Sequence, residues 1–142
     1  MRAIRVSEEW QRAGVYFVRT LAMCRGFGAP LTGEFSEDTP ESEYILVLEG
    51  EDPVSTCRIR LVDVRTGKIE RVVTLEEYRG QGYGAAAIEA AEAWLAEKGA
   101  ERILVNSRIA SVGFYEKLGY TPDYEKQSGS GLFACVMTEK QL

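Results

Sequence analysis

The 142-residue sequence contains no histidine. A chain without histidine has no Ser-His-Asp triad, no Cys-His nucleophile pair and no zinc site with a histidine ligand. Its three cysteines, Cys24, Cys57 and Cys135, lie far apart, show no metal-binding spacing and are expected to be small buried apolar residues. We therefore expect no metal site, and we expect any chemistry to use carboxylates, tyrosine, lysine, cysteine, backbone amides or water.

Long apolar runs and basic clusters are also absent. No apolar run approaches the ~18 residues of a membrane-spanning helix, and the N-terminal residues lack the apolar core of a signal peptide. The formal net charge is −5 without a run of Lys or Arg, whereas binding to a polyanion requires a basic face. We expect a cytoplasmic protein with no membrane or nucleic-acid partner, and the acidic balance favours cationic or amine-bearing substrates.

What the sequence does contain is typical of a globular domain. Hydrophobic residues make up 45% of the chain and charged residues 27%, and both values are ordinary. A chain of this length buries roughly two thirds of its unfolded surface. Because no repeat, low-complexity tract or linker divides the sequence, residues 1–142 are expected to form a single domain.

Apolar spacing and turn residues predict a mixed α/β order of elements. Helices are expected over Ser7 to about Cys24, over the Ala-rich segment from Gly82 to Lys98, and over Ser111 to Leu118. The acidic segment 33–43 is expected to form a polar loop, and Thr66-Gly67 a hairpin turn. Strands are expected at residues 4–6, 44–48, 54–64, 68–75, 103–105 and 132–137.

The segment Arg79-Gly80-Gln81-Gly82-Tyr83-Gly84 lies between a predicted strand and the strongest predicted helix. The first amides of a helix are unpaired and carry a partial positive charge, and glycines let a bulky anion approach the backbone. Arg79 adds a fixed positive charge that suits phosphate oxygens. The segment therefore indicates a seat for a phosphate or pyrophosphate, the alternative being a tight turn that merely needs glycine.

Two common nucleotide motifs fit this segment poorly. A P-loop requires a Lys-Ser or Lys-Thr pair after the glycines, and none follows here. Gly80, Gly82 and Ala85 match a dinucleotide fingerprint formally, but the charged stretch 76–79 separates them from the strand, and the next strand ends at Asn106 instead of an acidic residue. Redox chemistry with a dinucleotide stays as an alternative.

The pattern R-x-x-G-x-G, formed by Arg79, Gly82 and Gly84, resembles the acyl-CoA-binding motif of the GNAT superfamily of N-acetyltransferases. Residues 67–79 resemble the strand and loop before that motif, and residues 111–120, SVGFYEKLGY, are similar to the second signature of the superfamily, F-Y-x-x-L-G-[FY]. The resemblance implies a single GNAT-like α/β (α+β) domain. It would have a central, mixed, mostly antiparallel twisted sheet of six to seven strands, flanked by about four helices.

The resemblance also implies a donor site for acetyl-CoA without a metal. Backbone amides of residues 81–85 would hold the CoA pyrophosphate, and the end of the strand at residues 72–74 would splay from its neighbour and pair with the pantetheine arm. Asn106 would contact the pantetheine or, alternatively, serve only as a turn residue. The implied cofactor-binding residues are Val72, Val73, Thr74, Arg79, Gly80, Gln81, Gly82, Tyr83, Gly84, Ala85, Asn106 and Tyr115.

Two residues are candidates for catalysis. Tyr115 matches the general-acid position of the superfamily and would protonate the CoA thiolate, the alternative being a half-buried aromatic residue. Glu70 is expected to share a face with Val72 and Thr74, where burial would raise its pKa toward that of a useful base. Its alternative is a salt bridge with an arginine, namely Arg58, Arg60 or Arg71. Many relatives carry a glutamate at the position of Lys68, and a water relay to the backbone or to Glu76 stays open.

The implied reaction is direct attack of a primary amine, on a small molecule or a peptide, on acetyl-CoA. The acceptor pocket is expected between Phe17 and Glu43, a region without a recognisable signature. Relatives often carry histidines at two places where this chain has Arg108 and Ser130. A non-catalytic acyl-CoA sensor is therefore the alternative function, and a homodimer is compatible with the resemblance. The acidic residues of the loop are expected to be solvated, the alternative being that they attract a cation, and they are Glu34, Glu37, Asp38 and Glu41.

Overall fold

The computed structural model describes residues 1–142 and confirms the predicted fold class. Seven strands form one sheet in the order β1-β2-β3-β4-β5-β7-β6, and every neighbouring pair is antiparallel except β4 and β5. The strands are β1 (Arg2–Arg5), β2 (Glu43–Glu49), β3 (Asp52–Leu61), β4 (Thr66–Thr74), β5 (Arg102–Arg108), β6 (Thr121–Ser128) and β7 (Cys135–Gln141). The helices are α1 (Glu9–Arg19), α2 (Leu31–Glu34), α3 (Tyr83–Glu97) and α4 (Val112–Lys117).

Short helical turns extend or connect these elements. A π-helical turn, Thr20–Arg25, continues α1, and 3₁₀ turns follow β4, β5 and β6 at Glu76–Tyr78, Ile109–Ser111 and Gly131–Phe133. No helix combines the length with the apolar composition that a membrane-spanning segment requires.

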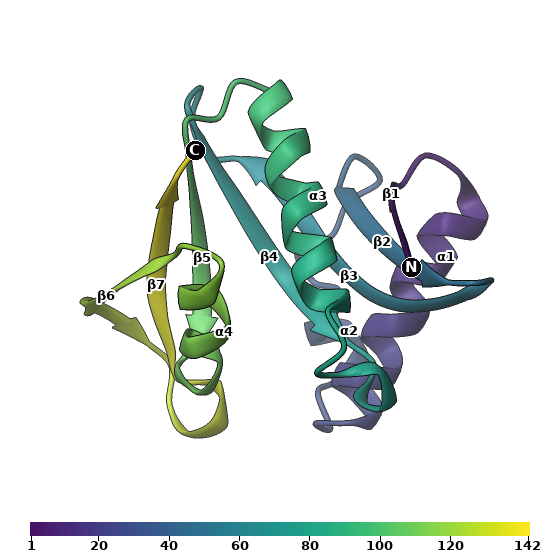
Figure 1. The fold of residues 1–142 in the computed structure, drawn as a ribbon. Helices are drawn as coiled ribbons and strands as arrows, with labels where there is room; N and C mark the ends of the chain where they lie inside the picture. The colour runs from purple at the N-terminus through teal and green to yellow at the C-terminus, as the bar shows by residue number, and fades with distance from the viewer.

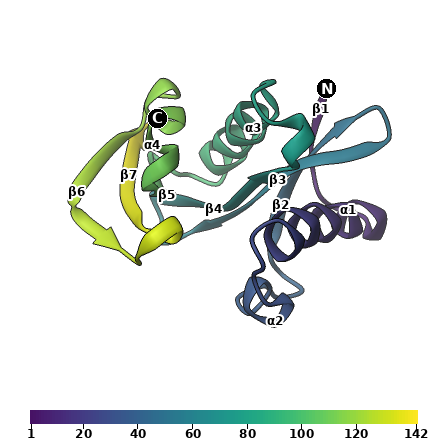
Figure 2. The ribbon, with the colours of Figure 1, turned by 90° about the horizontal axis from the view of Figure 1, so that it is seen from below.

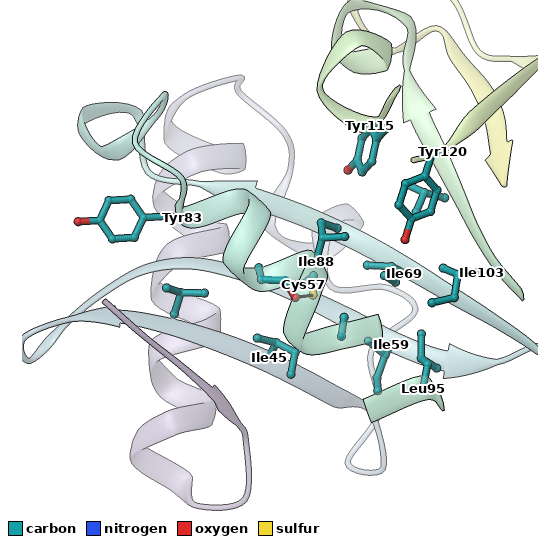
Figure 3. Packing of buried hydrophobic residues seen from close by; sticks show 14 of the residues in the cluster. Ile45, Cys57, Ile59, Ile69, Tyr83, Ile88, Leu95, Ile103, Tyr115 and Tyr120 are labelled. Carbon is teal, nitrogen blue, oxygen red and sulfur yellow. Dashed lines mark hydrogen bonds between the residues drawn. The ribbon is translucent and has the colours of Figure 1, made fainter. Parts of the chain in front are cut away.

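The helices cover both faces of the sheet. Helices α1 and α2 lie on one face, and α3 and α4 lie on the other (Figure 2). The main core packs beneath α3, where Ile88 and Leu95 are fully buried against Ile45 and Ile69 of the strands (Figure 3). Burying such aliphatic side chains contributes roughly 1.5–3 kcal/mol each, so α3 is firmly anchored on the sheet. Tyr83, the first residue of α3, is also buried, so the first turn is held against the sheet as well.

Strands β4 and β5 pair only at their beginnings. Thr66 to Lys68 lie in parallel register with Arg102 to Leu104, and no further pairs join the two strands. Beyond these pairs β4 runs on to Thr74 and β5 to Arg108, and the strands diverge in a V (Figure 1). The predicted splay of the strand near residues 72–74 is thus present.

A β-bulge interrupts β4. Thr56 pairs with Val73 and Arg58 pairs with Glu70, so that Arg71 and Val72 both face the single residue between Thr56 and Arg58. Arg71 has a φ of 53°, and no other non-glycine residue has a positive φ. The extra residue reverses the alternation of side chains, because Val72 packs on the same core as Ile69. The prediction that Glu70 shares a face with Val72 and Thr74 is therefore wrong.

Several predicted boundaries differ from the structure. Thr66 and Gly67 begin β4, and the turn lies before them, where the Asp63 carboxylate accepts a hydrogen bond from the Arg65 amide at 2.8 Å. The last strand begins at Cys135, since the preceding residues form a 3₁₀ turn. The sequence did not predict strand β6, because its residues are almost all exposed and show no apolar alternation.

Candidate active site

The gap between β4 and β5 forms a cleft of about 760 Å³, lined by residues of the α1–α2 region, such as Met23 and Glu34, and by residues of α3 and α4, such as Gly84 and Tyr115. It brings together nearly all of the residues that the sequence predicted for the site. These are Glu70, Val72, Val73, Thr74, Arg79, Gly80, Gly82, Gly84, Ala85, Asn106 and Tyr115. Gln81 and Tyr83, also predicted, do not line the cleft.

The amides at the start of α3 have no protein acceptor. Gly82 is the N-cap residue, with a φ of 91° that favours glycine, and no side chain caps the helix. None of the amides of residues 80–85 donates a hydrogen bond within the protein, whereas the next amide, of Ala86, donates to the Gly82 carbonyl at 3.0 Å. This row of unpaired donors beside the cleft is chemically suited to a diphosphate.

The side chains of Tyr83 and Gln81 are engaged away from the cleft. The Tyr83 ring packs edge to face on Tyr78 at 5.6 Å, its hydroxyl donates to Glu49 at 2.6 Å, and it points away from Tyr115 (Figure 3). The Gln81 amide group donates to the Glu77 carbonyl at 3.1 Å. For these two residues only the backbone amide is free to bind an anion.

Arg79 lies against the end of β4. Its Nε donates to the Thr74 carbonyl at 3.1 Å, and its Cζ lies 5.9 Å from the centroid of the Phe27 ring. No carboxylate forms a salt bridge with Arg79, so its guanidinium charge is available to a ligand in the cleft.

Tyr115 projects from α4 toward the space between α4 and α3 (Figure 3). Its ring packs edge to face on Phe114 and Tyr120, at 5.0 and 5.8 Å, and 6% of the residue is exposed. Burial, and then the nearby Cys57 thiol, raise the pKa of the Tyr115 phenol above its usual value. The phenol is therefore protonated at neutral pH, which is the state that a proton donor requires.

Glu70 is held by cations. Its carboxylate accepts hydrogen bonds from Arg58 at 2.7 Å and from Arg60 at 2.9 Å, and Lys68 lies 3.6 Å away. Burial alone would raise the pKa of Glu70, but these hydrogen bonds outweigh it and hold the pKa below its ordinary value. The expected rise in pKa is therefore wrong, and two of the three arginines proposed as alternative partners form salt bridges with Glu70.

Two carboxylates of the predicted polar loop are buried in ion pairs. Fully buried Arg19 contacts Glu34 at 2.8 Å and Asp38 at 2.6 Å. Burial opposes the charge on Asp38, but hydrogen bonds from Arg19 and Tyr44 lower its pKa to about 2. The expectation of a fully solvated loop is wrong at Glu34 and Asp38, because their arginine partners come from α1 and β3, whereas Glu37 and Glu41 are exposed.

The cleft also contains residues that the sequence did not single out. Met23, Arg71, Ser111, Phe114 and two aromatic residues, Phe27 and Phe133, line it. Phe27 and Phe133 meet edge to face at 6.0 Å although they come from opposite ends of the chain. No local motif marks either phenylalanine, and only Phe114 had a signal, since it precedes Tyr115 in the second signature. The thiol of Cys57 lies outside the cleft, and burial raises its pKa to about 12.

Comparisons with known proteins agree with this geometry. The model of the acetyltransferase (GNAT) family matches residues 19–120. The chain is 34% identical over 127 residues to the uncharacterised N-acetyltransferase YjcF of Bacillus subtilis, covering 89% of this chain and 90% of the relative. A Lactobacillus plantarum crystal structure assigned as an N-acetyltransferase superposes with a TM-score of 0.90 at 27% identity, covering 99% of this chain and 97% of that one.

A more distant structure carries the donor that the motif implies. A GNAT family acetyltransferase from Elizabethkingia anophelis, with acetyl-CoA bound, has a TM-score of 0.73 at 13% identity and covers 99% of this chain and 97% of that one. At this identity the likeness concerns the fold alone.

Proposed function

The chain belongs to the acetyltransferase (GNAT) family and is an acyltransferase, and on this premise we propose that it moves an acetyl group from acetyl-CoA to a primary amine by direct attack. The observation that carries the proposal is the row of unpaired amides at residues 80–85, which opens onto the cleft that contains Tyr115. The acceptor would be a small molecule or a peptide.

In this proposal the donor is held along the cleft from α3 to β5. The amides of residues 80–85 bind the pyrophosphate, and Arg79 adds charge beside them. The free edge of β4 at residues 72–74 pairs with the pantetheine arm as an added strand would, and Asn106 contacts it from β5. CoA supplies the thioester, and an amide on this edge of β4 polarises the thioester carbonyl.

The proposed chemistry uses one proton donor from the protein. The neutral amine forms a C–N bond with the acetyl carbon, the C–S bond breaks, and the thiolate takes the phenolic proton of Tyr115. The proton that the amine loses passes through water and restores the phenol. Glu70 lines the cleft, but its lowered pKa makes it a weak base, so water is the proton acceptor and Glu70 holds the arginines beside it.

The test is thiol release from acetyl-CoA with a panel of primary amines. Wild-type protein should release thiol only when an amine is present. Tyr115→Phe should lower kcat by about 10²-fold, because the thiolate then leaves without a positioned acid. The KM for acetyl-CoA should change by less than about threefold, since the ring and the anion seat remain. Tyr124→Phe, at an exposed tyrosine on β6, is the matched control.

Two other results would favour the alternatives. Tight CoA binding without amine-dependent thiol release from any amine would favour a non-catalytic sensor. Protection against thermal unfolding by NAD, and not by CoA, would favour dinucleotide redox chemistry. A cytoplasmic location and a homodimer are further parts of the proposal, and size-exclusion chromatography with light scattering tests the homodimer.

A further inference from the structure

The carboxylates of the cleft are neutralised by the protein itself. Only two carboxylate residues line the cleft, Glu34 and Glu70. Glu34 accepts from Arg19 at 2.8 Å and lies 3.3 Å from Arg71, while Glu70 is held by the arginines of β3. Neither carboxylate is free to pair with a cationic acceptor. The net negative charge of the whole chain therefore does not mean that the cleft attracts cations.

Of the three arginines that line the cleft, Arg71 forms salt bridges, whereas Arg79 and Arg108 do not. The two terminal nitrogens of Arg71 face Glu34 at 3.3 Å and Glu37 at 3.7 Å. In contrast, Arg79 and Arg108 form no salt bridge, and each donates only from Nε to a backbone carbonyl. Because the anion seat accounts for Arg79, Arg108 is the remaining cation of the cleft without an anionic partner.

Arg108 is fixed in place with its terminal nitrogens free. Its Nε donates to the Leu132 carbonyl at 2.9 Å. Its Cζ lies 5.2 Å from the centroid of the Phe27 ring and 5.8 Å from that of Phe133, two rings that meet edge to face. This arrangement orients the guanidinium plane and leaves the two Nη groups as a donor fork.

The face of β5 on which Arg108 lies indicates that its guanidinium contacts the acceptor. On β5, Val105 is buried in the core beneath α3, so residues 106 and 108 lie on the opposite face by the alternation of a strand. That face is the one covered by α1 and α2, whereas the anion seat lies at the start of α3 on the other face (Figure 2). A second substrate that enters from the face of α1 and α2 would therefore meet Arg108, next to the point where Asn106 is proposed to contact the pantetheine arm.

We propose that the acceptor amine also carries a carboxylate, as an amino acid does, and that the Nη groups of Arg108 bind this carboxylate. The inference rests on the proposed acetyl transfer and names its substrate class. A guanidinium matches a carboxylate with two parallel hydrogen bonds. The walls formed by Phe27, Phe133 and Met23 then contact the apolar body of the acceptor.

The experiment compares amino acids with their carboxamides as acceptors, for example phenylalanine with phenylalaninamide and leucine with leucinamide. The α-amino group of an amide, like that of a peptide N-terminus with a pKa of about 7.7–8.0, is more often neutral than that of a free amino acid. Intrinsic reactivity therefore favours the amides. A wild-type preference for the carboxylates of about tenfold or more in kcat/KM must then come from binding.

Variants of Arg108 connect this preference to the residue. Arg108→Gln should bring the carboxylate-to-amide ratio of kcat/KM close to one. Arg108→Lys keeps the charge but loses the planar fork, so its ratio should be intermediate. Calorimetry with CoA-saturated protein should detect phenylalanine binding to the wild type and a loss of binding in Arg108→Gln. Arg65→Gln, at an exposed arginine in the β3–β4 turn, should keep the wild-type ratio.

Two outcomes would overturn the inference. The first is a wild-type preference for the amides. The second is an unchanged ratio in both Arg108 variants, and an increased KM for acetyl-CoA in the same variants would then assign Arg108 to the donor. Failure of the proposed function is distinguishable, because it would abolish thiol release with amino acids and amides alike.

Discussion

Arg58 donates a 2.7 Å hydrogen bond from Nη2 to Oε2 of Glu70, its partner in the register of β3 and β4. The Arg58 guanidinium is almost fully buried and also donates to Asp38 at 2.9 Å. A buried cation needs such partners, since desolvation of an unpaired charge costs several kcal/mol. The negative charge of Glu70 thus stabilises the buried guanidinium of Arg58, and the Glu70 carboxylate stays ionised at neutral pH.

Glu70→Gln should lower the free energy of unfolding at pH 7 by about 2 kcal/mol, because Arg58 loses one of its charged partners. The folded-state pKa of Glu70 lies below its ordinary value of 4.5, so its stabilisation is present above that value and is lost as the pH falls through the folded-state pKa. Denaturant unfolding should therefore show a smaller difference between wild type and variant in acid. Glu116→Gln, at an exposed glutamate of α4, is the control.

The same variant tests the assignment of the base. If water accepts the proton of the amine, the pH dependence of kcat/KM around neutral pH should keep its shape in Glu70→Gln. Loss of an ionisation from that profile, with the protein still folded, would mean that Glu70 is the general base.

Asp38→Asn should lower the free energy of unfolding by about 3 kcal/mol at pH 7, because buried Arg19 and Arg58 lose a shared carboxylate. The pKa of Asp38 is about 2 in the folded state against an ordinary 3.8, so its contribution is present above the ordinary value and is lost as the pH falls toward 2. Unfolding measured across this acid range should depend less steeply on pH in the variant. Asp123→Asn removes an exposed carboxylate and should match the wild type.

The features that sequence predicts well are local. The glycines around Gly82 and the signature ending at Tyr120 lie in single segments, so their helices and their shared cleft could be anticipated. The ion pairs of Arg19 could not, because the partners Glu34 and Asp38 lie 15 and 19 residues further along the chain and the acidic composition of their segment favours a solvated loop. No residue pattern in the sequence predicts the bulge at Arg71 either. Because of this bulge, Glu70 does not share a face of the sheet with Val72 and Thr74.

The bulge predicts that glycine at position 71 gives a more stable protein than alanine, which is the reverse of the order in an ordinary strand. In an ordinary strand, alanine is more stable than glycine by roughly 0.5–1 kcal/mol. At Arg71, with a φ of 53°, any side chain is strained by about 1–2 kcal/mol, so Arg71→Gly should be more stable than Arg71→Ala. Both variants remove the same ion pairs, so their difference measured by denaturant unfolding isolates the backbone. At Arg60, without positive φ, alanine should be the more stable residue, and the same inversion there would contradict the explanation.

A larger side chain at Gly84 tests whether the donor passes the start of α3. A Cβ at Gly84 would lie 3.3 Å from the Phe114 ring and 3.5 Å from the Thr74 hydroxyl, two residues that line the cleft. The branched side chain of Gly84→Val would therefore fill the passage between α3 and α4 beside the unpaired amides. CoA affinity measured by calorimetry should fall by about tenfold or more, which corresponds to about 1.4 kcal/mol.

The control is another helical glycine. A Cβ at Gly113 in α4 has no atom within 4 Å, so Gly113→Val makes the same chemical change in open space. Glycine and valine differ by only a few tenths of a kcal/mol in intrinsic helix propensity, so Gly113→Val should keep its thermal stability and its CoA affinity. Equal CoA affinities in Gly84→Val and Gly113→Val would mean that the diphosphate does not pass Gly84, and the amides of residues 80–85 would then not be the anion seat.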